Sequence, residues 1–548
     1  MSLMSGLYVG TSGLQTSQNA LNTTAHNLTN VETTGYVRQQ VLQEDKNYNH
    51  IGNSSVSQKQ VGLGVEYGKV RQVRDSFLDK SYRLESGRSA FYDIMTETTN
   101  EIETLLGEFD GVAFQDSIGK LWTSVQELQK DPSSAVVQGE FVNNAAQFIE
   151  RAQAVYNGLK DYQDNLNERV KDKVDRINEL GREIYELNLQ INHEESNRLS
   201  EANDLRDRMN SALDELGALA NISYFTNADG ATEVLVEGIP LVGRDRVFEM
   251  STETEEGTGF IYPIWPQNEN QRVYILQKAD DICTKNNSDV GELKGLIYAR
   301  GDRRANYTDI EEVAYGEVYD GKMATETSTV MKVQAELDNM VHHLMVSVND
   351  ILVGDVKDPT ASYTKAEVDA MPQELFVRLG TERYVEQSDG TYKYIAEDTS
   401  GTPADISKMY TIANVKINSD ILKEPASLGN GFVLEDKNVD YARADAMAEA
   451  FEYPFGSLNP RLTLKLNYKD YYSALVGQTG TEGSVYMNIS NAQQIAVSQV
   501  DDARQAIIGV SSNEELSNMI KYQNAYNAAS RYITALNEML ENMISTFQ

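Results

Sequence analysis

The most regular pattern of apolar positions lies in the last segment of the chain, residues 513–548. Apolar residues recur there at steps that alternate between three and four, which is typical of a coiled-coil seam. Asn513 can cap such a helix, and two glutamates follow it at the positive end of the helix dipole. A rod of this length, about 50 Å, cannot cover its own seam, so it needs a partner helix. The predicted seam comprises Met519, Tyr522, Tyr526, Ala529, Ile533, Leu536, Leu540, Met543 and Phe547.

A second heptad pattern lies at the opposite end of the chain, in residues 1–35. Leu7, Leu14, Leu21 and Leu28 recur at every seventh position. We therefore predict that the first and last segments pair as complementary helices, and that these leucines and the C-terminal seam form an assembly interface. The alternative is that both helices pack separately on one globular core. Both seams are narrow and flanked by polar residues, which favours a helix packed on a helix.

The region between about residues 86 and 220 also has helical periodicity. One apolar stripe runs from Leu159 to Ile191 and predicts a very long helix. The stretch Lys130–Ser134 contains a proline and two serines, which can end one helix and begin the next. The polar segment at 192–203 then turns the chain back, which predicts an αα-hairpin within a helical bundle.

The periodicity changes to two after Asn221, where segments of alternating polarity flank an Asp229–Gly230 pair. Such a pair predicts a β-hairpin, and Asp389–Gly390 predicts another. The sequence therefore predicts an α+β multidomain protein with a discontinuous terminal α-helical coiled coil, a helical bundle and inserted β-rich domains. The predicted units are a terminal coiled-coil domain at 1–35 and 513–548, a mainly helical bundle with short β segments at 36–220, 323–353 and 466–512, a β-rich insertion at 221–322 and a second small insertion at 354–465.

The charge balance of the chain limits its partners. The chain has 83 acidic and 48 basic residues, for a net charge of −35. Such a chain repels nucleic acid and anionic membranes, so we expect neither as a partner. No run of eighteen apolar residues is present, and the N-terminus lacks the basic and apolar regions of a cleaved signal peptide. The single cysteine, Cys283, excludes an internal disulfide.

Residue patterns typical of catalysis or cofactor binding are missing from the sequence. His342 and His343 are adjacent, so on a helix they point about 100° apart and cannot share a metal ion. No phosphate-binding loop with Gly-Lys-Ser/Thr is present. The charged stretch Asp204–Arg208 is a candidate site, but a solvated face or a salt-bridged face between helices is the simpler interpretation. We therefore expect no enzyme activity, no catalytic or metal site and no cofactor.

Three blocks of the sequence resemble the flagellar rod, hook and hook-associated proteins of bacteria. Gly10–Gln40 is similar to their N-terminal signature, although Thr34 stands where the family usually has proline. Val61–Arg83 and Gly509–Leu540 are similar to a second and a C-terminal block of the family. The family motif positions that this chain matches include Asn27, Asn30, Gly35, Tyr36 and Gln523.

The C-terminal block is most similar to that of the hook-associated members, and this resemblance implies a structural axial subunit of the flagellum where hook and filament meet. It implies a homo-oligomeric ring that contacts the hook protein and the next hook-associated junction protein. It also implies an extracellular location, reached through the flagellar type III export apparatus with a dedicated export chaperone and without a cleaved signal peptide. Two alternatives remain open. One is another axial subunit (hook or distal rod), and the other is a surface adhesin that binds through the inserted domains.

Overall fold

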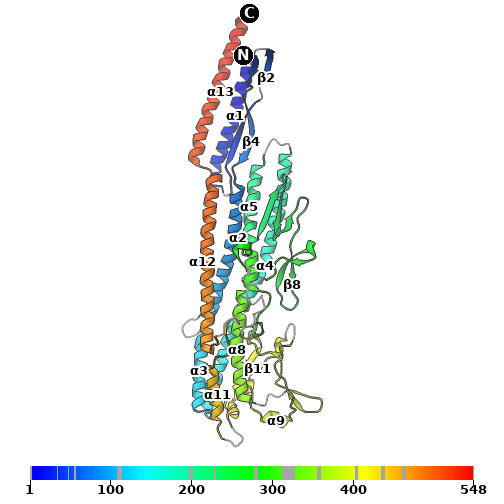
Figure 1. Cartoon of the computed structure of the whole chain (residues 1–548), viewed down its shortest axis with the longest axis vertical. Coiled ribbons are helices and arrows are strands. Elements are labelled where there is room, and N and C mark those ends of the chain that lie inside the picture. Colours follow the sequence, from blue (N-terminus) through cyan, green and yellow to red (C-terminus); the bar gives the residue numbers. More distant parts are fainter. Residues whose placement is uncertain are drawn as a thin grey trace.

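The computed structural model shows a long rod built mainly from helices (Figure 1). The long helices run along the rod, and the two chain ends lie together at one end of it (Figure 1). The predicted α+β class with long terminal helices is confirmed. The structure describes the chain apart from residues 1–2, 34, 47–48, 55–56, 108–113, 197–200, 228–229, 277–281, 311–327, 355–358, 401–404, 434–437, 459–463 and 547–548.

The order of the elements is nested, because helices from the start of the chain pack against helices from its end: α1 against α13, and α2 against α12. The helices are α1 (Leu3–Thr29), α2 (Ser76–Leu106), α3 (Phe114–Lys130), α4 (Ala135–Glu195), α5 (Asn203–Leu219), α6 (Glu292–Arg300), α8 (Thr329–Val353), α9 (Lys365–Ala370), α10 (Ser419–Lys423), α11 (Tyr441–Glu452), α12 (Tyr468–Ile508) and α13 (Ser512–Thr546). The strands are β1 (Gln39–Asp45), β2 (Asn49–Ser54), β3 (Ser57–Val61), β4 (Val65–Gln72), β5 (Ile222–Thr226), β6 (Thr232–Val236), β7 (Ile239–Val242), β8 (Ser251–Thr254), β9 (Ile261–Trp265), β10 (Gln271–Arg272), β11 (Phe376–Arg378), β12 (Tyr384–Glu386), β13 (Tyr392–Tyr394) and β14 (Val415–Ile417).

The longest helix of the rod is α4, with 61 residues. It begins directly after the predicted turn, with Ser134 at the N-cap position, and it continues through the whole predicted stripe. Phe141, Phe148, Leu166 and Ile184 are among its buried residues and belong to the main hydrophobic core. The prediction of a very long helix is confirmed. Because α4 contacts α2, α3, α5, α6 and α8, it connects most of the bundle.

Two helices differ from the predicted pattern. The first, α2, begins at Ser76 rather than near residue 86, because Asp75 caps it by accepting hydrogen bonds from two backbone N–H groups of the first turn. The second, α12, is one continuous helix of 41 residues although its sequence contains glycines that could interrupt a helix. Its Gly483 lies in close contact with α2, so this glycine permits helix packing instead of ending the helix.

The strands form small antiparallel sheets on the helical frame. Both predicted hairpins are confirmed. In the first, β5 pairs with β6, with Ile222 opposite Val236; Asp229 of the turn lies outside the described residues. In the second, β12 pairs with β13, and Gly390 between them has a φ of 78°, which glycine adopts without strain.

The second insertion contains a helix that the sequence analysis missed, α11. Asp440 caps this helix by accepting a hydrogen bond from the backbone N–H of Arg443. Met447 and Phe451 are buried, and the ring of Phe451 stacks on Trp122 of α3 with centroids 5.7 Å apart. The helix is short and rich in alanine, so its apolar stripe is weak. As a result, this part of the insertion belongs to the bundle core rather than to a separate sheet.

Asparagine side chains of α4 and α8 hold the inserted segments. Each asparagine contacts one residue of an insertion through two hydrogen bonds of 2.8–3.1 Å. The amide nitrogen donates to the backbone carbonyl of that partner residue, and the amide oxygen accepts from the partner's backbone N–H. A side-chain amide can form both hydrogen bonds because it has a donor and an acceptor. It therefore pairs with the backbone as a neighbouring β-strand would. All three asparagines are buried, which shields the hydrogen bonds from water. The pairs are Asn178 with Met250, Asn188 with Thr232 and Asn349 with Phe376.

The substitution Asn188→Leu tests this arrangement. It leaves the N–H and C=O groups of Thr232 buried and unpaired, so we expect the free energy of unfolding to fall by about 2–4 kcal/mol in urea denaturation. Hydrogen exchange in β6 should also become faster. The control is Leu189→Asn at the neighbouring position, which is 53% exposed and should change stability by less than about 0.5 kcal/mol. Equal effects of the two substitutions would show that the amide does not hold the insertion.

Candidate assembly site: the terminal helix pair and its joint

The helices α1 and α13 pack along each other at the end of the rod (Figure 1). Gly6 of α1 faces Leu536, whereas Gly13, two turns later, faces Ala529. The contacts move toward the start of α13 as they advance along α1, so the pair is antiparallel. The first and last helices of the chain therefore meet within one subunit.

Glycines bring the two helices close together. A Cβ atom added at Gly10 would lie 2.8 Å from Cγ1 of Ile533, and one at Gly6 would lie 3.0 Å from the hydroxyl of Tyr532. A Cβ contact as short as the one at Gly10 is essentially never observed, and the one at Gly6 is tighter than most, so a larger residue at either position requires the partner side chain or its helix to shift. The contact face of α1 is thus made of small side chains. Its described buried residues are Gly6, Gly10, Thr16, Ser17, Ala20, Thr24 and Asn27.

The predicted leucine row lies beside this face. Leu7, Leu14, Leu21 and Leu28 are each half-buried, not buried. The prediction placed the leucines at the centre of the pair, and the structure places small residues there because they allow a closer approach of the backbones. The leucines keep part of their apolar surface uncovered.

The predicted seam of α13 faces its partner along most of its length. Leu536 is buried, but Met543 is 44% exposed, and Phe547 lies outside the described residues. The end of α13 extends past α1, so the seam continues beyond the helix that covers it (Figure 1). The half-buried seam residues are Met519, Tyr522, Tyr526, Ala529, Ile533 and Leu540.

Asn27 joins the end of α1 to the start of α13. Its buried side chain uses both of its donors and accepts two hydrogen bonds. The amide oxygen accepts from the hydroxyl of Tyr36 at 2.8 Å and from the N–H of Gln39 at 3.0 Å. The amide nitrogen donates to the carbonyl of Gln39 at 2.9 Å and to Oε2 of Glu515 at 3.2 Å. Two motif positions from opposite sides of a turn, Asn27 and Tyr36, thus meet at the first turn of α13.

The other motif positions have separate roles. Asn30 donates to the carbonyl of His26 at 2.9 Å and so closes the end of α1. Gly35 has a φ of 80° and lies against α5. Gln523 is exposed on α13, and Thr34 lies outside the described residues. The motif therefore shapes the turn after α1 rather than one common site.

Glu515 is the most buried carboxylate of the terminal pair, at 2% exposure. Nε of Arg38 lies 2.9 Å from it, and Nη1 of Arg38 lies 3.2 Å from the exposed Glu514. The backbone N–H of Arg38 also donates to the carbonyl of Ile508 at the end of α12. Arg38 thus connects the segment after α1 to the end of α12 and to the start of α13. Arg38 and Glu515 were not among the predicted site residues.

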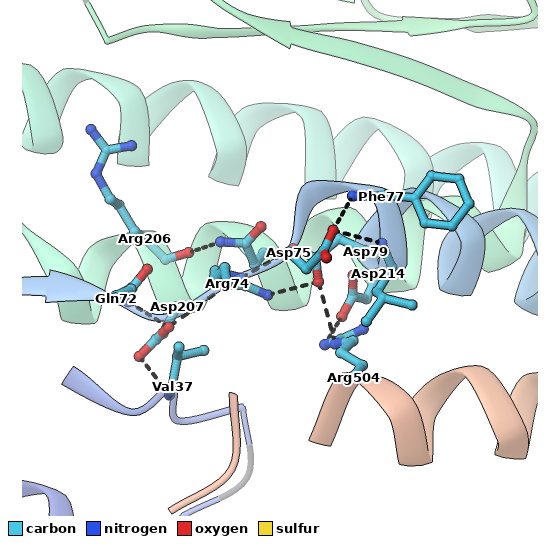
Figure 2. Close-up of polar contacts among 12 residues, drawn as sticks. Val37, Gln72, Arg74, Asp75, Phe77, Asp79, Arg206, Asp207, Asp214 and Arg504 are labelled. Atoms are coloured by element: carbon cyan, nitrogen blue, oxygen red, sulfur yellow. Dashed lines mark hydrogen bonds and ion pairs between the residues drawn. The ribbon is translucent and has the colours of Figure 1, made fainter. Parts of the chain in front are cut away.

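A row of alternating charges continues from there into the bundle (Figure 2). Asp79 of α2 lies between Arg74, at 3.2 Å, and Arg504 of α12, at 3.4 Å. Asp214 of α5 lies between Arg504, at 2.6 Å, and Arg83 of α2, at 2.7 Å. These side chains are buried or nearly so, and each carboxylate contacts two guanidinium groups, which offsets the cost of removing the charges from water.

Asp207 of α5 connects this row to the terminal segment, as Figure 2 shows. Its Oδ2 accepts from the N–H of Val37 at 3.2 Å, and its Oδ1 accepts from Nε2 of Gln72 at 2.7 Å. Burial raises the pKa of its carboxyl group to about 7, and the charge of Asp204 acts in the same direction, against Arg74 and the hydrogen bonds. The predicted salt-bridged helix face applies to Arg206 and its neighbours, whereas Asp207 is buried and holds the backbone.

Within the described residues, no group of three or more His, Cys, Asp and Glu side chains is placed to hold a metal ion. None of the described helices is long and apolar enough to cross a bilayer. The arrangement is suited to a mechanical task. It joins the two chain ends and attaches the resulting helix pair to a rigid bundle through buried polar contacts.

Comparisons with known proteins match both parts of this site. The family model described as the flagellar hook-associated protein FlgK helical domain matches residues 99–357. A model of flagella basal body rod proteins matches residues 7–36, and one of the basal body rod FlgEFG C-terminal region matches 504–546. Flagellar hook-associated protein 1 of Bacillus subtilis is 24% identical over 98% of this chain and 97% of its own length. The chain is similar to flagellar hook-associated protein 1 over nearly its full length.

Another relative also matches over nearly the whole of both chains. Flagellar hook-associated protein 1 of Salmonella typhimurium is 22% identical over 97% of this chain and 98% of its own. The solved structure of the flagellar hook junction protein FlgK from Burkholderia pseudomallei aligns with a TM-score of 0.52 and 12% identity, over 79% of this chain and 100% of that one, and it shares the fold. The predicted function class is confirmed: the chain is a structural axial subunit of the bacterial flagellum.

The substitution Gly10→Val tests the close approach of the terminal helices. The added side chain would collide with Ile533, so α13 must move away from α1. We expect hydrogen exchange in residues 529–540 to become at least about tenfold faster. Ala25→Val is the control, because Ala25 is exposed on the same helix. Unchanged exchange in the Gly10 variant would mean that the helices do not approach this closely.

The neighbouring acids Glu514 and Glu515 form a matched pair for testing the joint, because both contact Arg38. Glu515→Ala leaves Arg38 and Asn27 without their buried partner and should lower the free energy of unfolding by about 3 kcal/mol. Glu514→Ala removes an exposed ion pair and should lower it by less than about 1 kcal/mol. Urea denaturation compares the two. If Glu514→Ala has the larger effect, the buried carboxylate is not the anchor.

Proposed function

We propose that the chain occupies the junction between hook and filament as a ring of identical subunits, and that it assembles through its paired terminal helices. The observation that carries this proposal is the apolar surface that the pair leaves uncovered at the end of the rod. Water-exposed apolar surface of this kind is typical of an interface with another protein. The exposed apolar side chains of the pair are Tyr8, Leu516, Ile520, Tyr532, Met539, Met543 and Ile544.

The half-buried leucines of α1 support the same proposal. They flank the contact with α13 and retain surface for a second contact, which a neighbouring subunit would cover. The joint contributes to assembly in a different way. Because Arg38, Asp207 and the charges of Figure 2 fix the helix pair on the bundle, each subunit would present its pair at the same angle. Identical subunits need this uniformity to form a closed ring.

The wider set of partners is also a proposal. The names of the relatives support the hook protein on one side and the next hook-associated protein on the other. We infer export through the flagellar type III apparatus. The uncovered seam at the end of α13 would suit a dedicated chaperone before export. We assign no catalytic step to the chain, and we infer that the inserted domains project from the axis as structural modules.

Leu536→Asp tests the role of the terminal pair. The substitution places a carboxylate where Leu536 is buried against Gly6, so the pair should separate. We expect at least a tenfold loss of the subunit from isolated hook–filament particles, with far-ultraviolet circular dichroism close to wild type because the bundle remains folded. Removal of residues 519–548 should have the same effect. Asn537→Asp, at the exposed neighbouring position, is the control and should assemble normally. Normal junctions with Leu536→Asp would exclude assembly through the pair.

A further inference from the structure

A charged hollow lies at the side of the joint, between β4 and the facing ends of α4 and α5. Its volume is about 370 Å³. Four cationic side chains and two carboxylates line it, on a chain whose net charge is −35. A hollow with more positive than negative charges is unexpected on such an acidic chain. Its lining residues are Lys69, Arg71, Gln72, Arg74, Glu195, Glu201, Asn203 and Arg206.

The two carboxylates do not neutralise the outer cations. Glu195 is fully used by Arg206, which contacts it twice, at 2.7 and 3.0 Å. Glu201 lies 3.9 Å from Lys69, at the limit of an ion pair. Arg71 contacts only the uncharged Gln40, at 3.5 Å, among the described residues. The positive charges of Lys69 and Arg71 are therefore largely unneutralised within the subunit.

The positions of these two cations place them side by side. They are two residues apart on β4, and both line the hollow. Both residues are exposed. A carboxylate arriving from outside can therefore reach both at once, and it would not have to break an internal ion pair of the joint to do so.

Polar atoms at the floor of the hollow also lack partners. Asn203 is 7% exposed, and its Oδ1 has no hydrogen-bond partner among the described residues. Nη1 of Arg74 is likewise without a hydrogen bond there, and lies 3.8 Å from Asp207. Both atoms are buried beneath the surface of the hollow, so an incoming group would be bound by the exposed Lys69 and Arg71 instead.

We infer that this hollow binds an acidic side chain from a neighbouring copy of the same chain. This inference rests on the proposed function. A second copy is the fitting source because the subunits are identical and strongly acidic, so each presents carboxylates to its neighbour and gains from a cationic contact.

The position of the hollow gives this contact a role in assembly. Gln72 and Arg74 line the hollow and also contact Asp207, which holds the segment after α1. In Figure 2 the side chain of Arg206 points away from Asp207, so the same short stretch of α5 serves the joint on one side and the hollow on the other. A neighbour bound in the hollow would therefore brace the joint from outside.

Charge reversal tests the inference. The double substitution Lys69→Glu with Arg71→Glu should lower the amount of subunit in isolated hook–filament particles, relative to the amount shed into the medium, by at least about tenfold. The control is Lys120→Glu with Lys171→Glu, which makes the same charge change at two exposed positions outside the hollow and should assemble normally. Thermal denaturation of both purified proteins should match wild type. Equal incorporation of the two double variants would overturn the inference.

Carbodiimide coupling gives a second readout, because it links amines to carboxylates that are in contact. In particles, Lys69 should couple to a carboxylate that it cannot reach within one subunit, and this link should be absent from the monomer. Lys69→Arg should assemble and lose the link. Finding only the internal Lys69–Glu201 link in particles would also overturn the inference. If wild-type subunits are absent from the junction altogether, the proposed function itself fails, which is a distinct result.

Discussion

The nested arrangement of the chain depends on the close contact between its first helix and its last. Gly6, Gly10 and Gly13 face α13, and at Gly10 the approach is so close that an added side chain would collide with Ile533. Once the two ends meet, every segment between them must leave the axis and return to it. This explains why α2 packs on α12 directly below the terminal pair, and why the β-rich segments are insertions. The nested order of the elements follows from this one contact.

The joint below the pair makes the contact directional. A seam of apolar side chains gives affinity but little control of angle, because hydrophobic contacts are not directional. The buried charges at the joint supply the direction. Asp79, Asp214 and Glu515 can contact their arginines in only a few arrangements, and a misplaced carboxylate would be left buried and unpaired. Such a network adds little net stability, because burying its charges is costly. Its main effect here is to hold the helix pair at one angle to the bundle.

Several elements could be predicted from local sequence patterns. The seam of α13, the length of α4 and the two hairpins all follow from periodicity or from turn chemistry, which need no knowledge of distant residues. The contact face of α1 could not be found in this way, because the apolar leucines carry the heptad signal and the glycines that make the contact carry none. Spacing of Gly6, Gly10 and Gly13 at three and four residues was the available clue.

The joint and the asparagine contacts were beyond such patterns for another reason. Glu515 and Asn27 are separated by nearly the whole chain, and Asn188 resembles any polar residue on a helix until its partner strand is placed. The stretch Asp204–Arg208 was noticed for its charge, but only the fold shows that Asp207 faces inward. Long-range polar contacts depend on tertiary structure, whereas periodicity reports local structure.

The central claim, that α1 and α13 of one subunit pair in the assembled flagellum, can be tested by a disulfide. A Cβ atom at Gly13 would lie 3.8 Å from Cβ of Ala529, which is the usual separation in a disulfide. Gly13→Cys with Ala529→Cys, in a Cys283→Ser background, should therefore oxidise within each chain in isolated hook–filament particles. Non-reducing electrophoresis should then show a faster-migrating monomer. A ladder of linked chains, or free thiols on both cysteines, would contradict pairing within one subunit.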